Sequence, residues 1–193
     1  MQLNHQPKDV RLAARQGQRG FSLIEVSIVT AIVLLIAVIG IPAIGGYVME
    51  NKVPKVGQEL ARFVMHTRVN AGTSGEAPYD GIGTPSLAAL VADSTVLTAA
   101  ADGTVLHGLG GGGAVEVEPT DAGAGFLVRL RQVNHVACPS IASVLQRVAD
   151  RIVVSSDAGP AQTVKDVNIV YSALATESAC AKGDVNQFVF HVH

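Results

Sequence analysis

The sequence lacks tryptophan, and its 193 residues include only eight tyrosines and phenylalanines together and two cysteines. So few aromatic side chains argue against a surface that stacks on nucleic-acid bases. Two cysteines are too few for a disulfide-rich scaffold or a cysteine-rich zinc site, although they suffice for one bridge. Charged residues make up only 16% and the net charge is −2, which argues against intrinsic disorder and against electrostatic binding of nucleic acid.

Charge and hydrophobicity are distributed unevenly along the chain. Residues 1–20 carry four basic side chains and one acidic one, a net charge of +3, which leaves −5 for the rest. About 24 nearly continuous apolar residues follow, from Phe21 to Ile44, enough to cross a bilayer as a helix. A secretory signal peptide would have a shorter apolar core that ends in small residues. The basic residues ahead of the run predict a cytoplasmic N-terminus, with the rest of the chain across the membrane.

Glu25 is the one charged residue within this apolar run. A carboxylate inside a membrane is costly unless it is paired or remains at the interface. One interpretation is an interfacial glutamate in the first turn of a helix, where a negative charge suits the helix dipole. The neighbouring residues favour a second interpretation, in which the carboxylate has a specific partner.

The sequence around Glu25 resembles the cleavage signature of type IV prepilins and reads RGFSLIE over residues 19–25. In that family a membrane peptidase cuts after the glycine and methylates the new N-terminus. The resemblance implies cleavage between Gly20 and Phe21 and N-methylation of Phe21. Removing 20 of the 193 residues would leave a mature chain of 173. Glu25 would then be the fifth mature residue, where the family carries a glutamate that neutralises the amine of a neighbouring subunit during assembly.

Pro42 would be the 22nd mature residue, a position where many type IV pilins carry proline. Proline removes a backbone hydrogen bond and bends or locally melts a helix. The whole N-terminal pattern is shared by pilins, by the pseudopilins of type II secretion and by DNA-uptake pilins. It therefore indicates the machinery and leaves the role open.

Beyond Tyr47 the apolar residues recur at steps of three and four, which predicts an amphipathic continuation of the helix to about Ala71. Pro54 is a candidate break near the membrane boundary. A short helix is predicted to begin with Thr84 as its cap and Pro85 in its first turn. A third helix is predicted to open at Pro139.

Alternating apolar and polar residues predict several strands, with which the helices form an α+β domain. Residues 166–176 stay open between helix and strand, and turns are predicted at 110–113 and 157–160. The predicted strands cover residues 104–109, 115–118, 126–131, 152–154 and 185–193.

Cys138 and Cys180 are separated by 41 residues. The inferred topology places both in an oxidising compartment, so a disulfide is expected. Closing a loop of that size stabilises a fold by about 3–4 kcal/mol in the chain-entropy model. The alternative is a pair of buried free thiols.

The globular part resembles the type IVb pilins of the PilS kind, which are found on thin conjugative pili and are similar to toxin-coregulated pilins. The long leader also fits type IVb, whereas Phe21 as the first mature residue is typical of type IVa. The resemblance implies a type IV pilin fold, in which a long N-terminal helix packs on an antiparallel sheet and Cys138–Cys180 staples the C-terminal region. The resemblance lies in VLHGLGG (105–111), AVEVEP (114–119), FLVRLRQVNHVAC (126–138), SACA (178–181) and NQFVF (186–190).

Three other patterns suggest binding sites and have simpler explanations. The glycines at 108–113 lack the following helix of a dinucleotide site and the lysine of a P-loop, so a hairpin turn is predicted. His191 and His193 would share one strand face, but no third ligand is identifiable, and no metal site is predicted. The remaining candidate ligands are expected on the surface or in hairpins: His66, His107 and His135.

Arg129 and Arg131 share one face of a predicted strand. An anion site is one interpretation, and a solvated face or a salt bridge between subunits is the ordinary one. No constellation of catalytic residues is visible, so the sequence predicts neither enzyme activity nor a cofactor.

Together these features predict three regions. They are a basic leader over 1–20 that is removed, an apolar transmembrane and filament-core helix over 21–46, and the amphipathic half-helix with a periplasmic α+β domain over 47–193. We expect a structural subunit of a type IVb-like pilus, first in the bacterial inner membrane and then in an extracellular filament. Its expected partners are copies of itself, prepilin peptidase, the pilus assembly platform and inner-membrane lipid, with no specific nucleic acid.

Three alternatives remain. A pseudopilin of type II secretion or a minor pilin would share the N-terminal pattern. A membrane-anchored periplasmic enzyme would need catalytic residues and would retain residues 1–20. The sequence leaves open whether the filament serves adhesion, aggregation, conjugative mating or DNA uptake.

Overall fold

The computed structural model describes residues 20–71, 75–157 and 159–193, and it leaves out the side chains of residues 42–45. The predicted leader therefore lies outside the described residues, apart from Gly20. The described chain divides into two units, with the boundary between Ile41 and Pro42.

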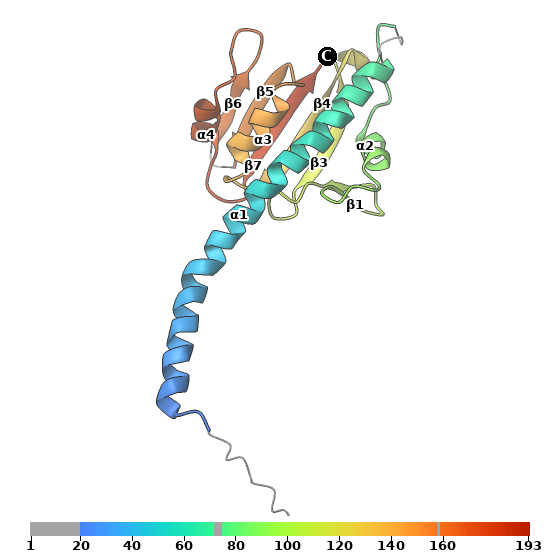
Figure 1. The fold of residues 1–193 in the computed structure, drawn as a ribbon. Helices are drawn as coiled ribbons and strands as arrows, with labels where there is room; N and C mark the ends of the chain where they lie inside the picture. Colours follow the sequence, from blue (N-terminus) through green and yellow to red (C-terminus); the bar gives the residue numbers. More distant parts are fainter. Residues whose placement is uncertain (1–19, 72–74, 158) are drawn as a thin grey trace, which may run out of the picture. The chain divides into compact units, whose positions relative to one another are not determined.

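Helix α1 (Leu23–Ala71) contributes to both units (Figure 1). Up to Ile41 nearly all of its side chains are exposed, including the large aliphatic ones. Within the second unit its buried residues recur at helical spacing, so one face packs on the sheet. The predicted end of the helix at Ala71 is confirmed. The buried side chains of α1 are Val53, Val56, Leu60, Phe63, Val64 and Ala71.

Pro54 does not interrupt α1, so the candidate break predicted there is wrong. Proline in a helix leaves the carbonyl four residues earlier without its N–H partner. Here that carbonyl belongs to Glu50, and both Glu50 and Pro54 are exposed, so water can hydrogen-bond the free oxygen.

A seven-stranded sheet lies under the second half of α1, with the strand order β1-β2-β3-β4-β7-β5-β6 and every neighbouring pair antiparallel. The last strand in chain order, β7, lies between β4 and β5 and so joins the two parts of the sheet. The strands are β1 (Thr98–Ala99), β2 (Val105–Leu106), β3 (Ala114–Thr120), β4 (Gly125–Val133), β5 (Arg151–Ser156), β6 (Gly159–Lys165) and β7 (Asn186–Val192).

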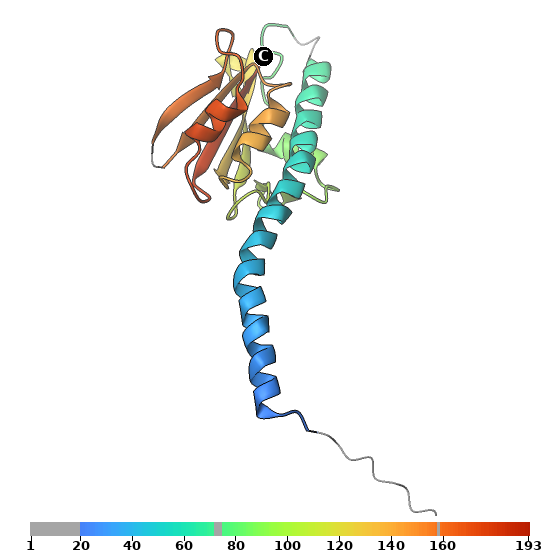
Figure 2. The same cartoon turned by 60° about the vertical axis from the view of Figure 1, so that its left-hand side comes forward.

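Three short helices and one 3-10 turn complete the described elements: α2 (Thr84–Leu90), α3 (Cys138–Leu145), α4 (Ala173–Ala179) and η1 (Asp121–Gly123). Figures 1 and 2 show the second half of α1 and α3 over the same face of the sheet. At the C-terminal end of α3, Lys165 Nζ donates to the carbonyls of Gln146 and Ala149 at 2.5 and 2.6 Å. A cation there complements the negative end of the helix dipole.

Thr84 is not the cap of α2, contrary to the prediction. Gly83 occupies the cap position, and no side-chain cap bond forms there. The Thr84 hydroxyl instead accepts a hydrogen bond from the Val117 N–H at 3.0 Å, which ties α2 to β3.

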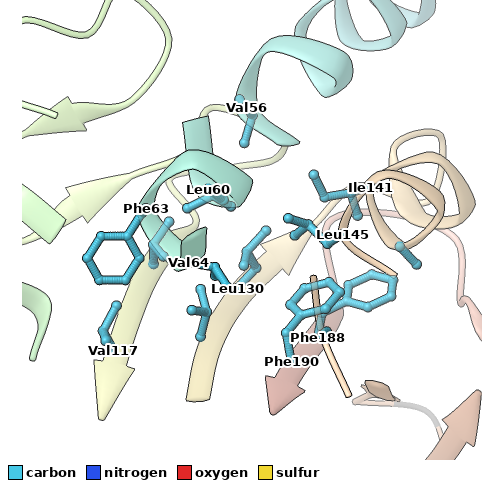
Figure 3. Packing of buried hydrophobic residues seen from close by; sticks show 14 of the residues in the cluster. Val56, Leu60, Phe63, Val64, Val117, Leu130, Ile141, Leu145, Phe188 and Phe190 are labelled. Carbon is cyan, nitrogen blue, oxygen red and sulfur yellow. The ribbon is translucent and has the colours of Figure 1, made fainter. Parts of the chain in front are cut away.

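The core lies between the helices and the sheet (Figure 3). On β7 the predicted alternation is confirmed, because Phe188, Phe190 and Val192 are all buried. The rings of Phe188 and Phe190 stack with their centroids 5.6 Å apart. The Phe63 ring of α1 meets the Phe126 ring of β4 edge to face at 6.3 Å, so the helix and the sheet share one aromatic contact.

The strand predictions fail mainly at the sheet edges. Strands β1 and β6 were not predicted, and the strand expected over 104–109 shortens to Val105–Leu106. Strand β6 contains Gly159 and Pro160 and has one paired neighbour, β5, so its apolar alternation is weak. Residues 166–176, which the sequence left open, form a turn followed by the start of α4 at Ala173.

Candidate functional site

The predicted cleavage site lies just before α1. Gly20, Phe21 and Ser22 are exposed and precede the first helical residue, Leu23. The Ser22 carbonyl accepts from the Val26 N–H at 3.1 Å, so the helical hydrogen bonds begin immediately after the predicted scissile bond. The Gly20–Phe21 peptide is therefore in an accessible, non-helical segment, as cleavage by a peptidase requires.

Glu25 lies in the first turn of α1, where its negative charge complements the helix dipole. It is exposed, and among the described residues it forms no ion pair. Glu25 and Phe21 line the same shallow hollow, of about 260 Å³, together with Val26, Val29 and Thr30. A carboxylate and the predicted new N-terminus thus lie on one side of an otherwise apolar helix.

The apolar part of α1 has no polar side chain, other than Glu25, that needs a partner from outside the helix. Ser27 donates to the Ile24 carbonyl and Thr30 donates to the Val26 carbonyl, each at 2.8 Å. Such bonds satisfy hydroxyl groups inside the helix itself. Among the described residues, α1 is the one helix long and apolar enough to cross a membrane.

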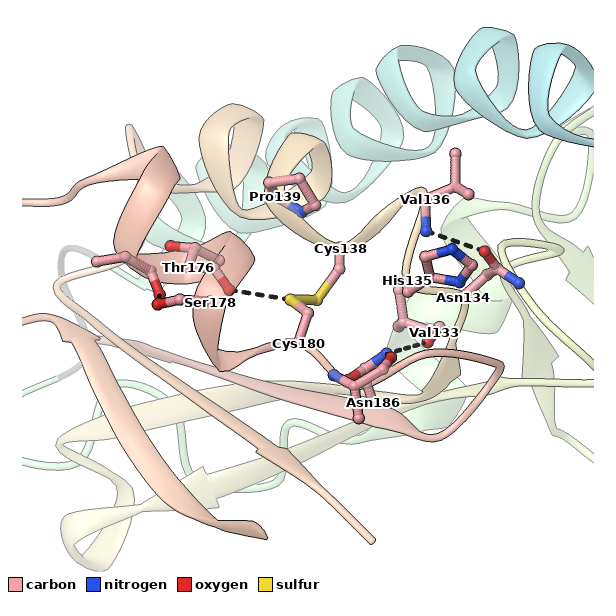
Figure 4. Close-up of a disulfide and its surroundings, with 12 residues drawn as sticks. Val133, Asn134, His135, Val136, Cys138, Pro139, Thr176, Ser178, Cys180 and Asn186 are labelled. Carbon is pink, nitrogen blue, oxygen red and sulfur yellow. Dashed lines mark hydrogen bonds between the residues drawn. A yellow bond between two sulfur atoms is a disulfide. The ribbon is translucent and has the colours of Figure 1, made fainter. Parts of the chain in front are cut away.

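The expected disulfide between Cys138 and Cys180 is present (Figure 4). Cys138 is the first residue of α3 and Cys180 directly follows α4, with their Cα atoms 6.4 Å apart. The bridge therefore fastens α4, which is only seven residues long, to α3 in the core.

A buried asparagine beside the disulfide was not predicted. Asn186 is fully buried, and its amide donates to the carbonyls of Val133 and Ala181 at 3.1 and 2.9 Å. Its side-chain oxygen accepts from the Ala181 N–H at 2.8 Å. Because every polar group of the side chain has a partner, Asn186 joins the end of β4 to the segment after the disulfide without an unsatisfied atom.

His107 lies in the connection between β2 and β3, which is the hairpin alternative of the prediction, but it is fully buried and is not a surface residue. Its Nε2 donates to the Arg131 carbonyl at 2.7 Å, and its Nδ1 accepts from the Leu109 N–H at 2.9 Å. This pair of bonds requires the neutral ring, and burial lowers the pKa of His107. His66 and His135 are exposed, as predicted.

The glycine-rich turn after His107 packs tightly against that ring. A Cβ atom on Gly113 would lie 2.4 Å from the His107 ring and 2.3 Å from the Arg131 carbonyl oxygen, so only glycine fits. The Gly111 N–H donates to the Asp184 carboxylate at 2.7 Å. Since the chain's own carboxylate occupies this donor, the turn is a structural element and not a phosphate cradle.

Arg129 and Arg131 do share one strand face, where they pair with carboxylates of β3. Glu116 accepts from Arg129 at 2.8 Å and from Arg131 at 2.6 Å, and Glu118 accepts from Arg129 at 3.2 Å. The hydrogen bond from Arg131 is the main cause of the lowered pKa of Glu116. The two guanidinium groups are thus neutralised within the chain, which argues against an anion site.

The surroundings of His191 and His193 are different. The His193 ring contacts Asp121 at 3.2 Å and lies beyond the end of β7. Burial, followed by the nearby Arg151 charge, lowers the pKa of His191. Over residues 20–71, 75–157 and 159–193, no group of three or more metal-binding side chains is found.

Two family comparisons match the chain. Residues 59–193 match the family described as PilS N terminal, and residues 15–41 match the prokaryotic N-terminal methylation motif. Among curated proteins, none matches significantly. The two matched segments cover the predicted cleavage site and nearly all of the second unit.

Proposed function

Because the chain belongs to the PilS family and carries the methylation motif of type IV prepilins, it is a type IV pilus subunit, and we propose that it polymerises into a type IVb-like surface filament. In this proposal prepilin peptidase cleaves between Gly20 and Phe21 and methylates Phe21. The regions are the removed leader (1–20), the membrane and filament-core helix (21–46) and the globular part (47–193). The second-ranked candidates are a pseudopilin and a minor pilin.

The observation that carries this proposal is the solitary carboxylate of Glu25. It is the one charged residue between Phe21 and Met49, it is exposed, and it lies beside Phe21. An unpaired carboxylate in an apolar environment is unfavourable, whereas a pairing with the Phe21 amine of a second subunit would remove that cost. Assembly would thus place each new subunit at a fixed register relative to its neighbour.

The exposed apolar surface of α1 explains how one segment could serve in two environments. In the membrane its side chains would contact lipid, and in the filament they would contact the same helices of other subunits. The surface is kept out of water in both states, so transfer from bilayer to filament does not expose it. Pro42 would soften the helix at the end of this segment by removing one backbone hydrogen bond.

The proposed orientation places the leader in the cytoplasm and the globular part in the periplasm before assembly. The +3 charge of residues 1–20 favours retention on the cytoplasmic side. The Cys138–Cys180 disulfide fits an oxidising compartment for the globular part. The remaining proposed partners are the inner-membrane lipid and the pilus assembly platform.

The test compares E25A with a matched control, E50A, which removes the next acidic residue along α1. Both variants should insert into the membrane and lose residues 1–20, because neither change touches the scissile bond. Only E25A should fail to produce filaments in the sheared cell-surface fraction. Normal filament yield from the E25A strain would refute the proposed role of Glu25.

Intact mass spectrometry of the sheared and membrane fractions distinguishes the candidate roles. An abundant surface species that lacks residues 1–20, carries one added methyl group and contains the disulfide would support a major pilin. The same species confined to the membrane fraction would support a pseudopilin or a minor pilin. A chain that retains residues 1–20 in cells with active prepilin peptidase would contradict the proposal.

A further inference from the structure

The ring of His107 lies between two backbone groups whose hydrogen-bonding roles are fixed. Its Nε2 is 2.7 Å from the Arg131 carbonyl, which can only accept, and its Nδ1 is 2.9 Å from the Leu109 N–H, which can only donate. These partners require one tautomer of the neutral ring, with its proton on Nε2. Because the ring is fully buried, water cannot replace either partner.

Protonation of this ring would break one of the two bonds and leave the other. Both nitrogens of a charged imidazole are donors. The bond from Nε2 to the Arg131 carbonyl would persist, whereas the new Nδ1–H would point at the Leu109 N–H. Two buried donors that face each other are unfavourable, because neither has an acceptor. The added proton therefore acts on the turn that follows His107 and not on strand β4.

This turn consists of residues 108–113, and we call it the glycine turn. Its Gly111 N–H donates to the Asp184 carboxylate at 2.7 Å, and its Leu109 carbonyl accepts from the Asn134 N–H at 2.7 Å. The Leu109 side chain is buried in the core. Release of the turn would therefore bring an aliphatic side chain to the surface.

Several elements bring charged or titratable groups to the surroundings of the glycine turn. These are Lys52 of α1, Glu116 of β3, Arg131 of β4, His135 before α3 and Asp184 before β7. Glu116 and Arg131 pair with each other at 2.6 Å. Histidine is the residue type whose charge ordinarily changes between pH 5 and 8. A response in this range therefore has to be assigned to either His107 or His135.

We propose that His107 is a pH-sensitive switch, which holds the glycine turn closed while its ring is neutral and releases the turn when its ring is protonated. Release exposes the Leu109 side chain and frees the Asp184 carboxylate from the Gly111 N–H. The sheet stays paired, because the pairing of β3 with β4 extends over residues outside the turn. Acid would thus change one part of the surface without unfolding the globular part. The switch belongs to the single subunit, so it does not depend on filament formation.

The size of the effect follows from the protonation of His107 in the two states. In the released turn the ring is in water, with the ordinary pKa of about 6.5, whereas burial lowers the pKa of His107 in the closed turn. Below pH 6.5 the released state therefore takes up the proton first, and acid favours it. Between pH 7.5 and 5.0 the equilibrium constant for opening should rise by up to about 30-fold.

Hydrogen–deuterium exchange of the full-length chain in detergent micelles measures this opening, after correction for the intrinsic pH dependence of amide exchange. The protection factors of the amides at 109–113 should fall by up to about 30-fold between pH 7.5 and 5.0. The turn at 166–169 is an internal reference without histidine, closed by N–H groups that donate to the Asp166 carboxylate, and its protection should change little. The amides of β7 report unfolding of the whole domain and should stay more protected than the glycine turn at both pH values.

Two variants identify the group that titrates. In H107N the amide oxygen lies near the former position of Nδ1 and accepts from the Leu109 N–H at every pH, because an amide does not titrate. The pH response of the glycine turn should therefore be lost. H135N is the matched control, since it removes the exposed histidine beside Asn134, and it should keep the response of the parent.

Equal protection of the glycine turn at both pH values in the parent would overturn the inference. A turn that is as protected as β7 at both pH values would also overturn it, because the turn would then open only when the whole domain unfolds. An undiminished response in H107N, or a lost response in H135N, would show that His107 is not the switch. If H107N does not fold, the comparison of the three segments in the parent still decides the matter.

Discussion

Gly57 of α1 lies close against α3, so substitution of this glycine tests how tightly the two helices pack. A Cβ atom added there would lie 2.6 Å from Val144 Cγ1, 3.0 Å from Val144 Cβ and 3.5 Å from Ile141 Cδ1. Favourable carbon contacts are about 3.5–4.0 Å. Valine is branched at Cβ and stiff in χ1, so rotation does not relieve the first two contacts.

Two opposing effects determine how much G57A changes the free energy of unfolding. Alanine gains about 1 kcal/mol over glycine in a helix interior. Overpacking of a close contact costs about 1–3 kcal/mol, and a 2.6 Å approach belongs in the upper part of that range. We therefore expect G57A to lower the free energy of unfolding by about 1–2 kcal/mol. In G57A/V144A the 2.6 Å contact is removed and the 3.0 Å contact with the Cβ atom of residue 144 remains, so the double variant should be more stable than the sum of the two single changes by about 1 kcal/mol.

Urea-dependent pulse proteolysis of the full chain in membranes, quantified by immunoblot, measures these differences. With a urea slope of about 2 kcal/mol per molar, G57A should shift the midpoint down by about 0.5–1 M. A G57A midpoint equal to or above that of the parent would refute the reasoning. Strict additivity in G57A/V144A would show that Val144 is not the obstructing side chain.

Three further predictions concern other contacts of the globular part. C138S/C180S should lose about 3–4 kcal/mol of stability, seen as lower steady-state subunit levels and faster proteolysis; unchanged levels and resistance would contradict it. K165M keeps the side-chain length but leaves two carbonyls at the end of α3 without the ammonium, so its urea midpoint should correspond to a loss of about 2 kcal/mol. His107 is held neutral in the fold, so its pKa lies below the unfolded value of about 6.5, and the unfolded chain takes up the proton first. Its contribution to stability is complete above about pH 6.5 and declines as the pH falls below that value. Urea midpoints between pH 7.5 and 5.5 should show this decline in the parent and a smaller one in H107N; equal slopes would contradict the assignment.

The features that could be predicted from the sequence are those with a strong local period or a local motif. The end of α1 at Ala71 follows from apolar residues at three- and four-residue steps, and the burial on β7 follows from strict alternation. The disulfide could be predicted because the chain has two cysteines and the inferred compartment is oxidising, where cysteines of this kind ordinarily form a disulfide.

The features that were missed depend on contacts between distant parts of the chain. His107 is buried because the Arg131 carbonyl, 24 residues away, accepts from its ring. That carbonyl lies just before Gln132, which has a positive φ of 55° and belongs to an irregularity in the β4–β7 pairing. Strand β6 likewise exists because β5 pairs with it, and its own sequence alternates poorly. Local patterns carry no signal for such partners.

The central place of β7 has a consequence for how the domain comes to be folded. Before Asn186–Val192 has been synthesised, β1–β4 and β5–β6 are two separate sheets. The edges of β4 and β5 that later pair with β7 then have no partner strand. The hairpins β3–β4 and β5–β6 join neighbouring segments of the chain, but the complete sheet forms only after the last strand has been synthesised. Non-local pairing of this kind is slow, in the range of milliseconds to seconds. During that interval the edges of β4 and β5 that later pair with β7 are exposed. If α1 is anchored in the membrane, the incompletely folded chain cannot diffuse freely in solution, which limits its encounters with the exposed edges of other copies.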